Sequence, residues 1–275
     1  CVAAALFLEE TETMKRWRYV LLVLCTAVIS ISGTYLMNYF MKSEENKQKY
    51  EDISEIGFPE TEADHEEEND QQDVKQSEDD FDYQSLIAMN SDCVGWIQIP
   101  GTDINYPVVQ AADNEFYLTH NFNRETAACG AIFMDYRNHV DAKAEHLILY
   151  GHQMKDNSMF KQLNGYKEEI FYKEHPNIKL YLHEQKYEYE ITAVYVTDVA
   201  NGGGYYNYLH WNTRKEQLNY LQQKMAGYQI YDTGKKVMET DELLSLSTCE
   251  YSSDNGRLIV QARRKGEMTD GKQII

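Results

Sequence analysis

The strongest constraint in the sequence is an uncharged run of 23 residues, Tyr19 to Met41. A helix rises about 1.5 Å per residue, so a helix of this length crosses the roughly 30 Å hydrocarbon core of a bilayer. The basic cluster Met14 to Arg18 precedes the run, and basic flanks stay in the cytoplasm. We therefore expect a cytoplasmic segment at residues 1–18, a single-pass anchor in the cell membrane at 19–41, and an extracellular remainder.

A cleaved signal peptide is the alternative interpretation of the same run. Ser30 to Ser32 provides a small-x-small pattern of the kind that signal peptidases cut. The apolar stretch nevertheless continues well past this point, which favours a membrane anchor.

The segment that follows is strongly acidic. Between Ser43 and Asp82 the chain has 17 Asp and Glu against three Lys, which accounts for −14 of the net charge of −19 and leaves −5 elsewhere. Few apolar residues interrupt it, so we expect residues 42–82 to form a flexible acidic stalk. No D-x-[DN]-x-[DN]-G spacing for a Ca²⁺ loop occurs, and we expect neither a metal nor another cofactor. Nucleic acid is not an expected partner, because no Lys/Arg cluster accompanies the acidic charge.

Residues 83–275 carry the pattern of a folded domain, with many short strand-like runs and few helical ones. The predicted strands are Val94 to Ile99, Tyr106 to Gln110, Ala131 to Asp135, His146 to Tyr150, Ile178 to Leu182, Lys186 to Asp198, Glu242 to Thr248 and Leu258 to Arg263. Helical patterns cover Phe81 to Asn90, Asn114 to His120, Met159 to Tyr166, Lys167 to His175 and Asn212 to Met225. This order predicts a mainly β fold, a barrel or sandwich with helical insertions.

Cys249 is the first candidate for chemistry. It ends a strand-like run, and the turn after it leads to a strand that begins near Arg257. A hairpin of this kind can place Arg257 beside the thiol, because directly opposite residues share a face. A lone Cys can equally be a small buried apolar residue, so the spacing leaves both interpretations open.

His152 is the second candidate. It follows Gly151 at the end of a buried strand, and Gly allows the chain to turn and a substrate to come close. Thiol chemistry needs an imidazole nearby to stabilise the thiolate or to protonate a leaving amine. Among the eight histidines, His152 alone combines a strand end with a preceding Gly.

From about Tyr83 to Arg264 the chain resembles a class B sortase. The similar segments occur in the family's order and are Val94 to Thr102, Ile104 to Gln110, Asp113 to Leu118, Gly130 to Arg137, Tyr150 to Phe160 and Ser245 to Cys249. The helical pattern between the last strands also resembles a class B insertion. Two departures are mild: Ser245 stands where the family usually has Thr, and Ala262 where it commonly has Gly.

The resemblance implies a closed sortase-type β-barrel, a catalytic domain at 83–275 and a cysteine transpeptidase reaction. Cys249 would attack the carbonyl after Thr in a C-terminal sorting signal of the Asn-Pro-x-Thr-Asn type on a secreted protein. His152 would protonate the leaving amine, and Arg257 would donate hydrogen bonds to the oxyanion or to the substrate backbone. An amine of a peptidoglycan precursor would then release the thioester.

The resemblance also implies substrate contacts at four positions, Ser247, Glu250, Asn114 and Leu118. Core packing is an equally reasonable role for Leu118. A guanidinium from Arg263 or Arg264 is the alternative to Arg257, although Arg263 lies about 20 Å further along an extended strand.

Other functions remain open at this point. A papain-like peptidase would place Cys at a helix start with His downstream, which is the reverse of the order here. A surface adhesin or other non-enzymatic binding module would need no reactive thiol. Within the sortases, pilus polymerisation is the alternative to cell-wall anchoring.

Overall fold

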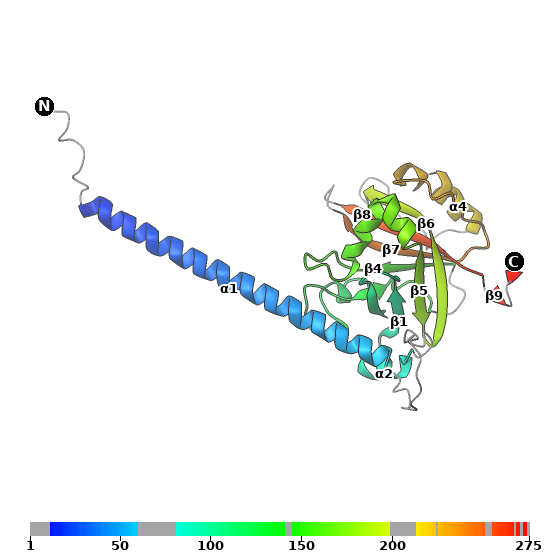
Figure 1. Cartoon of the computed structure of the whole chain (residues 1–275), viewed down its shortest axis with the longest axis horizontal. Helices are drawn as coiled ribbons and strands as arrows, with labels where there is room; N and C mark the ends of the chain where they lie inside the picture. The colour runs from blue at the N-terminus through cyan, green and yellow to red at the C-terminus, as the bar shows by residue number, and fades with distance from the viewer. Residues whose placement is uncertain are drawn as a thin grey trace, which may run out of the picture. The chain divides into compact units, whose positions relative to one another are not determined.

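The computed structural model describes residues 12–59, 81–140, 145–198, 213–223, 225–250, 255–266, 268–269 and 272–273. The chain divides into two compact units, Cys1–Glu45 and Asn46–Ile275 (Figure 1). Helix α1 (Glu12–Gly57) begins in the first unit and ends in the second.

In the first unit, α1 carries the apolar run. Its best 18-residue window has a mean hydropathy of 2.1, which makes it long and apolar enough to cross a bilayer by length and composition. Its large apolar side chains, including Leu21, Val23 and Leu36, are exposed. The structure therefore agrees with the sequence on a continuous apolar helix.

The second unit is built on a closed barrel with the strand order β1-β2-β3-β4-β7-β8-β6-β5. The strands are β1 (Cys93–Gln98), β2 (Asn105–Val109), β3 (Ile132–Met134), β4 (His146–Tyr150), β5 (Asn177–Leu182), β6 (Gln185–Asp198), β7 (Leu243–Glu250) and β8 (Gly256–Arg264). The short strands β9 (Met268–Thr269) and β10 (Lys272–Gln273) pair with each other. The prediction of a mainly β, closed barrel is confirmed.

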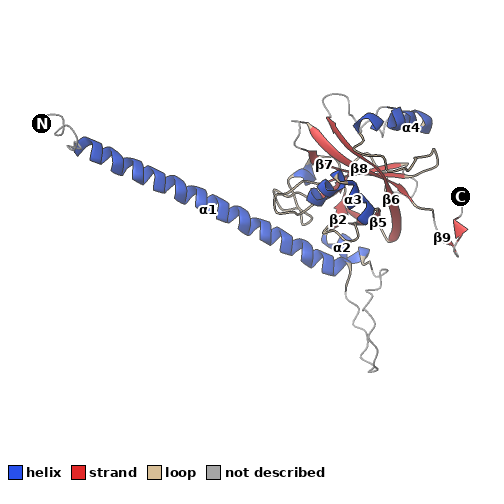
Figure 2. Ribbon diagram, turned by 45° about the horizontal axis from the view of Figure 1, so that its top comes forward, coloured by secondary structure: helices blue, strands red, loops and turns tan. Residues whose placement is uncertain are grey.

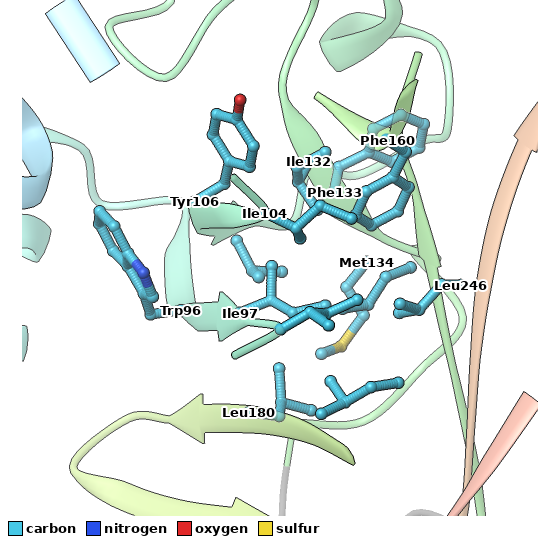
Figure 3. Packing of buried hydrophobic residues seen from close by; sticks show 14 of the residues in the cluster. Trp96, Ile97, Ile104, Tyr106, Ile132, Phe133, Met134, Phe160, Leu180 and Leu246 are labelled. Atoms are coloured by element: carbon cyan, nitrogen blue, oxygen red, sulfur yellow. The ribbon is translucent and has the colours of Figure 1, made fainter. Parts of the chain in front are cut away.

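The barrel interior is filled by branched and aromatic side chains from all of its strands. Ile97, Ile132, Leu180 and Leu246 converge there and are almost fully buried (Figure 3). Strand β1 is buried on both faces, because Trp96 packs outside the barrel against aromatic rings. This double burial explains why β1 has a continuous apolar sequence rather than an alternating one.

Helices lie between the strands, and most of them are shorter than the sequence pattern predicts. They are α2 (Tyr83–Met89), α3 (Glu169–Glu174) and α4 (Arg214–Gln223), with 3₁₀ helices η1 (Phe116–Leu118), η2 (Phe160–Lys167) and η5 (Met225–Tyr228). Asp82 caps α2 by accepting a hydrogen bond from the backbone N–H of Ser85 at 2.9 Å. The expected helix at residues 114–120 is a single 3₁₀ turn.

The prediction of a flexible stalk at residues 42–82 differs from the structure over residues 43–57, which are helical. Tyr50 and Ile53 are 6% and 2% exposed and belong to the core cluster of the barrel unit. Tyr50 Oη donates to the carbonyl of Gly130 at 3.0 Å, and Ser54 Oγ accepts from Asn105 Nδ2 at 3.0 Å. Residues 60–80 of the expected stalk lie outside the described residues.

Strands β7 and β8 are buried on both faces. One face points into the barrel core and the other faces outward, and the candidate site lies on the outer face. Leu244 and Leu246 face the barrel core, whereas Leu243 and Ile259 belong to a second cluster with Leu218 of α4. Helix α4 thus covers part of the outer face of the sheet (Figure 2). By strand alternation, Cys249 and Arg257 lie on this outer face.

Candidate active site

Cys249 is the penultimate residue of β7 and carries a free, partly exposed thiol. Two other cysteines of the domain, Cys93 and Cys129, are buried, and burial raises the pKa of their thiols to about 12 and about 11. Those two thiols are therefore protonated at neutral pH, and a thiolate is the reactive form of Cys. Within the described part of the domain, Cys249 is the thiol that a reactant can approach.

Arg257 lies directly opposite Cys249 in the antiparallel pairing of β7 with β8. Opposite residues in such a pair are about 4.5–5.5 Å apart and share a face. Arg257 Nη1 donates to the carbonyl of Gly256 at 2.8 Å, which folds the guanidinium toward the turn. The hairpin predicted from the sequence thus places Arg257 opposite Cys249.

His152 lies two residues beyond the end of β4, the strand beside β7. Strands β4 and β7 run parallel with Tyr150 opposite Ser247, and Gly151 N donates to Ser247 O at 3.2 Å. His152 and Cys249 each lie two residues beyond that last pair, and neighbouring strands are about 4.8 Å apart. The structure therefore brings imidazole and thiol to adjacent strand ends.

The ring of His152 lies against backbone atoms of Leu118 and Gly130. Its Nε2 donates to the carbonyl of Leu118 at 2.7 Å, which makes Nε2 the protonated nitrogen in the neutral ring. A Cβ added at Gly130, where φ is +57°, would lie 3.1 Å from Cδ2 of the ring. Gly130 is needed for both its conformation and this close approach. The sequence offers no signal for a backbone acceptor such as the Leu118 carbonyl.

Asn114 is held at both ends of its amide. Nδ2 donates to Asp135 Oδ2 at 3.0 Å, and Oδ1 accepts from Tyr136 N at 3.0 Å. Asp135 also accepts from Tyr150 Oη at 2.8 Å and pairs with Arg137 at 2.7 Å. Burial alone would raise the pKa of Asp135, but these hydrogen bonds outweigh it and lower the pKa below its ordinary value.

Asp135 was not singled out as a site residue by sequence reasoning. Its only signal was its place in the segment Gly130 to Arg137 that resembles a family motif. The structure shows a fully buried carboxylate that connects Asn114 with Tyr150, next to the last β4–β7 pair. Asp135 thereby fixes the side chains of Asn114 and Tyr150.

The remaining predicted contact residues fall on different faces. Ser247 is buried and shares the outer face with Cys249, whereas Leu118 is 40% exposed beside His152. Glu250 alternates to the opposite face, where its carboxylate pairs with Lys167 Nζ at 2.6 Å. Ser247 thus shares a face with Cys249, Leu118 contacts His152 through its backbone carbonyl, and Glu250 lies on the opposite face.

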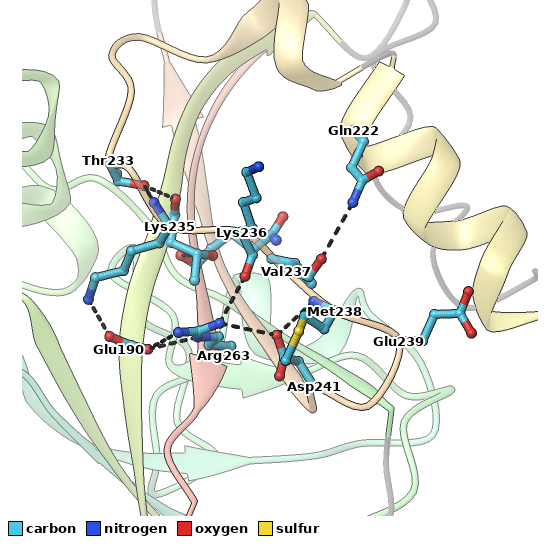
Figure 4. Close-up of polar contacts among 12 residues, drawn as sticks. Glu190, Gln222, Thr233, Lys235, Lys236, Val237, Met238, Glu239, Asp241 and Arg263 are labelled. Carbon is cyan, nitrogen blue, oxygen red and sulfur yellow. Dashed lines mark hydrogen bonds and ion pairs between the residues drawn. The ribbon is translucent and has the colours of Figure 1, made fainter. Parts of the chain in front are cut away.

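The two alternative guanidiniums, those of Arg263 and Arg264, form ion pairs with other residues. Arg263 pairs with Glu190 at 2.6 Å and with Asp241 at 3.6 Å, at the far end of β8 (Figure 4). Arg264 pairs with Glu242 at 2.7 Å. These three ion pairs lie at the end of β8 where Arg263 is opposite Leu243, so neither guanidinium lies beside Cys249.

Two further side chains hold the end of β7. Gln153 Nε2 donates to the carbonyl of Cys249 at 3.1 Å, and Lys167 pairs with Glu250 as described. Sequence reasoning missed both, because contacts across about a hundred residues leave no local pattern.

The arrangement suits nucleophilic acyl transfer. A thiol supplies the nucleophile, an adjacent imidazole can move a proton, and a guanidinium can stabilise a developing oxyanion. Within the residue ranges described above, no three His, Cys, Asp or Glu side chains are grouped to hold a metal ion.

Comparisons with known proteins agree with this chemistry. The sequence model of the Sortase domain family matches residues 97–265. Sortase B of Listeria monocytogenes is 38% identical over 180 residues, which cover 65% of this chain and 72% of that protein. Sortase B of Staphylococcus aureus is 30% identical over 261 residues, which cover 91% and 97%. The solved structure of a Staphylococcus aureus sortase B–substrate complex aligns with a TM-score of 0.67 at 30% identity, over 82% of this chain and 98% of that one.

Proposed function

The chain belongs to the sortase family and is a class B cysteine transpeptidase, and we propose that Cys249, His152 and Arg257 carry its reaction. One observation carries the assignment. The β7–β8 register sets Arg257 opposite Cys249, and the β4–β7 ladder sets His152 at the equivalent strand end. The proposal is supported by the position of these three chemically complementary residues at the ends of three neighbouring strands.

The first step forms a thioester. The Cys249 thiolate attacks the carbonyl carbon of a Thr residue in the sorting signal, and the carbonyl oxygen becomes an oxyanion that Arg257 stabilises. Collapse of this intermediate breaks the peptide bond, and protonated His152 gives its proton to the leaving amine. Oxyanion stabilisation of this kind contributes about 3–4 kcal/mol to lowering a barrier.

The second step reverses the roles. An amine attacks the thioester carbonyl, His152 accepts the proton that this amine loses, and Cys249 departs as thiolate. The products are a new amide bond and the free enzyme. We propose an amine of a peptidoglycan precursor as the acceptor, which would attach a secreted protein to the cell wall.

The substrate is proposed to be a C-terminal sorting signal of the Asn-Pro-x-Thr-Asn type or a variant of it. The proposal is supported by Ser247 on the same face of β7 as Cys249, by Leu118 beside His152, and by Asn114, whose side chain Asp135 fixes. Glu250 was expected to contact substrate as well. Its ion pair with Lys167 favours a role in supporting the strand end instead.

The apolar helix α1 supports a location at the cell membrane. We propose that residues 19–41 span the bilayer once and that the barrel unit lies on the extracellular face. The basic residues before the apolar run support this orientation. Secreted substrates and wall precursors are both available on that side.

A peptide cleavage assay tests the proposed function. The full chain in detergent should cleave a fluorogenic Asn-Pro-x-Thr-Asn peptide after Thr and, with an added amine, form the transpeptidation product. Cys249→Ala should abolish both activities, and His152→Ala should lower kcat/KM at least about a hundredfold. Retained turnover by Cys249→Ala with unchanged folding would refute the mechanism.

A further inference from the structure

On the side that faces β4, the backbone of β7 is held beside Cys249 by a side chain rather than by a strand, whereas on its other side Cys249 pairs with Arg257 of β8. Gly151 N donates to Ser247 O at 3.2 Å, the last backbone hydrogen bond between the β4 side and β7. In a regular parallel ladder the next donor would be the N–H of residue 153 and the next acceptor the carbonyl of Cys249. At this position the side-chain amide of Gln153 donates to Cys249 O, at 3.1 Å.

The use of a side-chain donor in place of a backbone donor has a geometric consequence. Because the amide reaches across, the backbone after Gly151 can leave the sheet while β7 keeps a hydrogen bond at the same place. The departure lets His152 occupy the strand end next to Cys249. Gln153 therefore satisfies two requirements. The chain can turn away after Gly151 to present His152, and strand β7 stays ordered as far as Cys249.

The loop that carries Gln153 is itself tightly fixed. Phe160 N donates to His152 O at 2.9 Å, and Gln153 forms an antiparallel bridge with Met159. Met159 is almost fully buried, has a φ of +57°, and donates its N–H to Tyr106 Oη at 3.0 Å. A non-glycine residue keeps such a conformation only where its surroundings determine it. The amide of Gln153 thus extends from a rigid support.

A second contact from the same segment acts on the next residue of β7. Lys167, at the end of η2, pairs with Glu250 at 2.6 Å. Consecutive residues of β7 are therefore attached to the segment that begins at His152, through Gln153 and through Lys167. Neither contact depends on strand pairing.

We propose that Gln153 is a positioning residue, which holds the backbone of Cys249 at the distance and angle from His152 that acyl transfer requires. The inference rests on the proposed function of Cys249 and His152. Gln153 reaches the reacting atoms only through the nucleophile's own backbone. Misplacement of a reacting group by about 1 Å can cost about a hundredfold in rate, so loss of the amide should lower kcat with little effect on KM.

The test compares Gln153 variants of the full chain in detergent. Gln153→Leu removes the donor and keeps the size, and Gln153→Glu keeps the shape but presents an acceptor to the Cys249 carbonyl. Each should lower kcat for the sorting-signal peptide about tenfold or more, with KM within about twofold of wild type. Gln162→Leu is the matched control, because Gln162 lies in η2 and bonds to Asp103 away from the site. It should keep wild-type kcat.

A second measurement separates positioning from folding and from the proposed function. The rate at which a methanethiosulfonate reagent labels Cys249 is followed against pH in each variant. Gln153→Leu and Gln153→Glu should shift the midpoint of this profile, whereas Gln162→Leu should not. Wild-type kcat together with an unchanged midpoint in both Gln153 variants would overturn the inference, as would a change in KM alone. Peptide turnover by Cys249→Ala would instead refute the proposed function, and the labelling comparison would still judge Gln153.

Discussion

At the scale of single residues, Arg257 and Arg263 lie six positions apart on the same face of β8 and have different surroundings. Arg257 faces Cys249, and Arg263 is paired with Glu190 and Asp241. A guanidinium that serves in an oxyanion site and one that serves in an ion-pair network should respond differently to substitution.

We predict that Arg257→Ala lowers kcat/KM at least about a hundredfold with little loss of stability, because it removes a transition-state contact. Arg263→Gln should keep most of the activity and lower the free energy of unfolding by about 1 kcal/mol, the scale of a partly exposed ion pair. Peptide kinetics and urea unfolding of both variants check this. A larger loss of activity for Arg263→Gln would reverse the assignment.

The sequence was enough to predict which side chains lie beside each other on neighbouring strands. It was not enough to predict the contacts that backbone atoms make. The alternation of β8 and the turn before it were enough to place Arg257 near Cys249. The position of the His152 ring depends on the carbonyl of Leu118 and on the absence of a side chain at Gly130. Neither feature has a residue type that marks it, so only the folded backbone reveals it.

At the scale of elements, the junction after β4 controls where His152 lies. Gly151 has almost no room around its Cα, since an added Cβ would lie 2.7 Å from Cδ2 of the buried Phe160 ring. The backbone can approach this ring only because Gly has no side chain.

Gly151→Ala should therefore destabilise the domain by about 1–3 kcal/mol, the usual cost of overpacking a core, and should also reduce kcat by moving His152. Gly227→Ala is a suitable control, because an added Cβ there would meet nothing within 4 Å. Thermal unfolding and peptide turnover measure the two effects. Equal behaviour of the two variants would show that the junction tolerates displacement.

Strand positions agree with the sequence within one or two residues, since buried strands read as compact apolar runs bounded by turns. The 3₁₀ segments η1 and η2 were predicted only as helical patterns, because periodicity over a few residues does not separate the two types of helix. The helical segment at residues 43–57 was missed for another reason. Its acidic composition concealed Tyr50 and Ile53, whose spacing of three residues was the available signal.

At the scale of the whole molecule, stability depends on contacts between distant segments. Tyr50 and Ile53 join the barrel core, so Tyr50→Ala should cost about 3–5 kcal/mol and Ile53→Ala about 2–5 kcal/mol. Ile56→Ala, at a position 37% exposed, should cost less than about 1 kcal/mol. Urea unfolding of the three variants checks this. Uniformly small effects would support a flexible stalk instead.

His146 gives the fold a defined response to acid. Burial and the nearby charge of Arg214 lower its pKa to about 3, and its ring is bonded to Ser245 and Gln217 beneath α4. In the unfolded chain His146 has a pKa of about 6.5 and binds a proton below that pH, whereas in the folded protein the same ring stays neutral until the pH is much lower. Stability should thus be complete above pH 6.5 and fall toward pH 3, by at most about 1.4 kcal/mol per pH unit from this group.

The measurement is the free energy of unfolding between pH 4 and 8 for wild type and for His146→Gln. Gln can still donate and accept hydrogen bonds but has no charge to gain, so its curve should be flatter below about pH 6.5. Parallel curves for the two proteins would show that other groups cause the acid sensitivity.

The central claim is that Cys249 carries the acyl group, and intact-protein and peptide-mapping mass spectrometry tests it most directly. The full chain is mixed with a sorting-signal peptide, quenched in acid within the first turnover, and digested. The account predicts an adduct with the mass of the peptide through Thr, attached to the fragment that contains Cys249, sensitive to hydroxylamine and absent in Cys249→Ala. An acyl group on any other residue, or cleavage by Cys249→Ala, would contradict it.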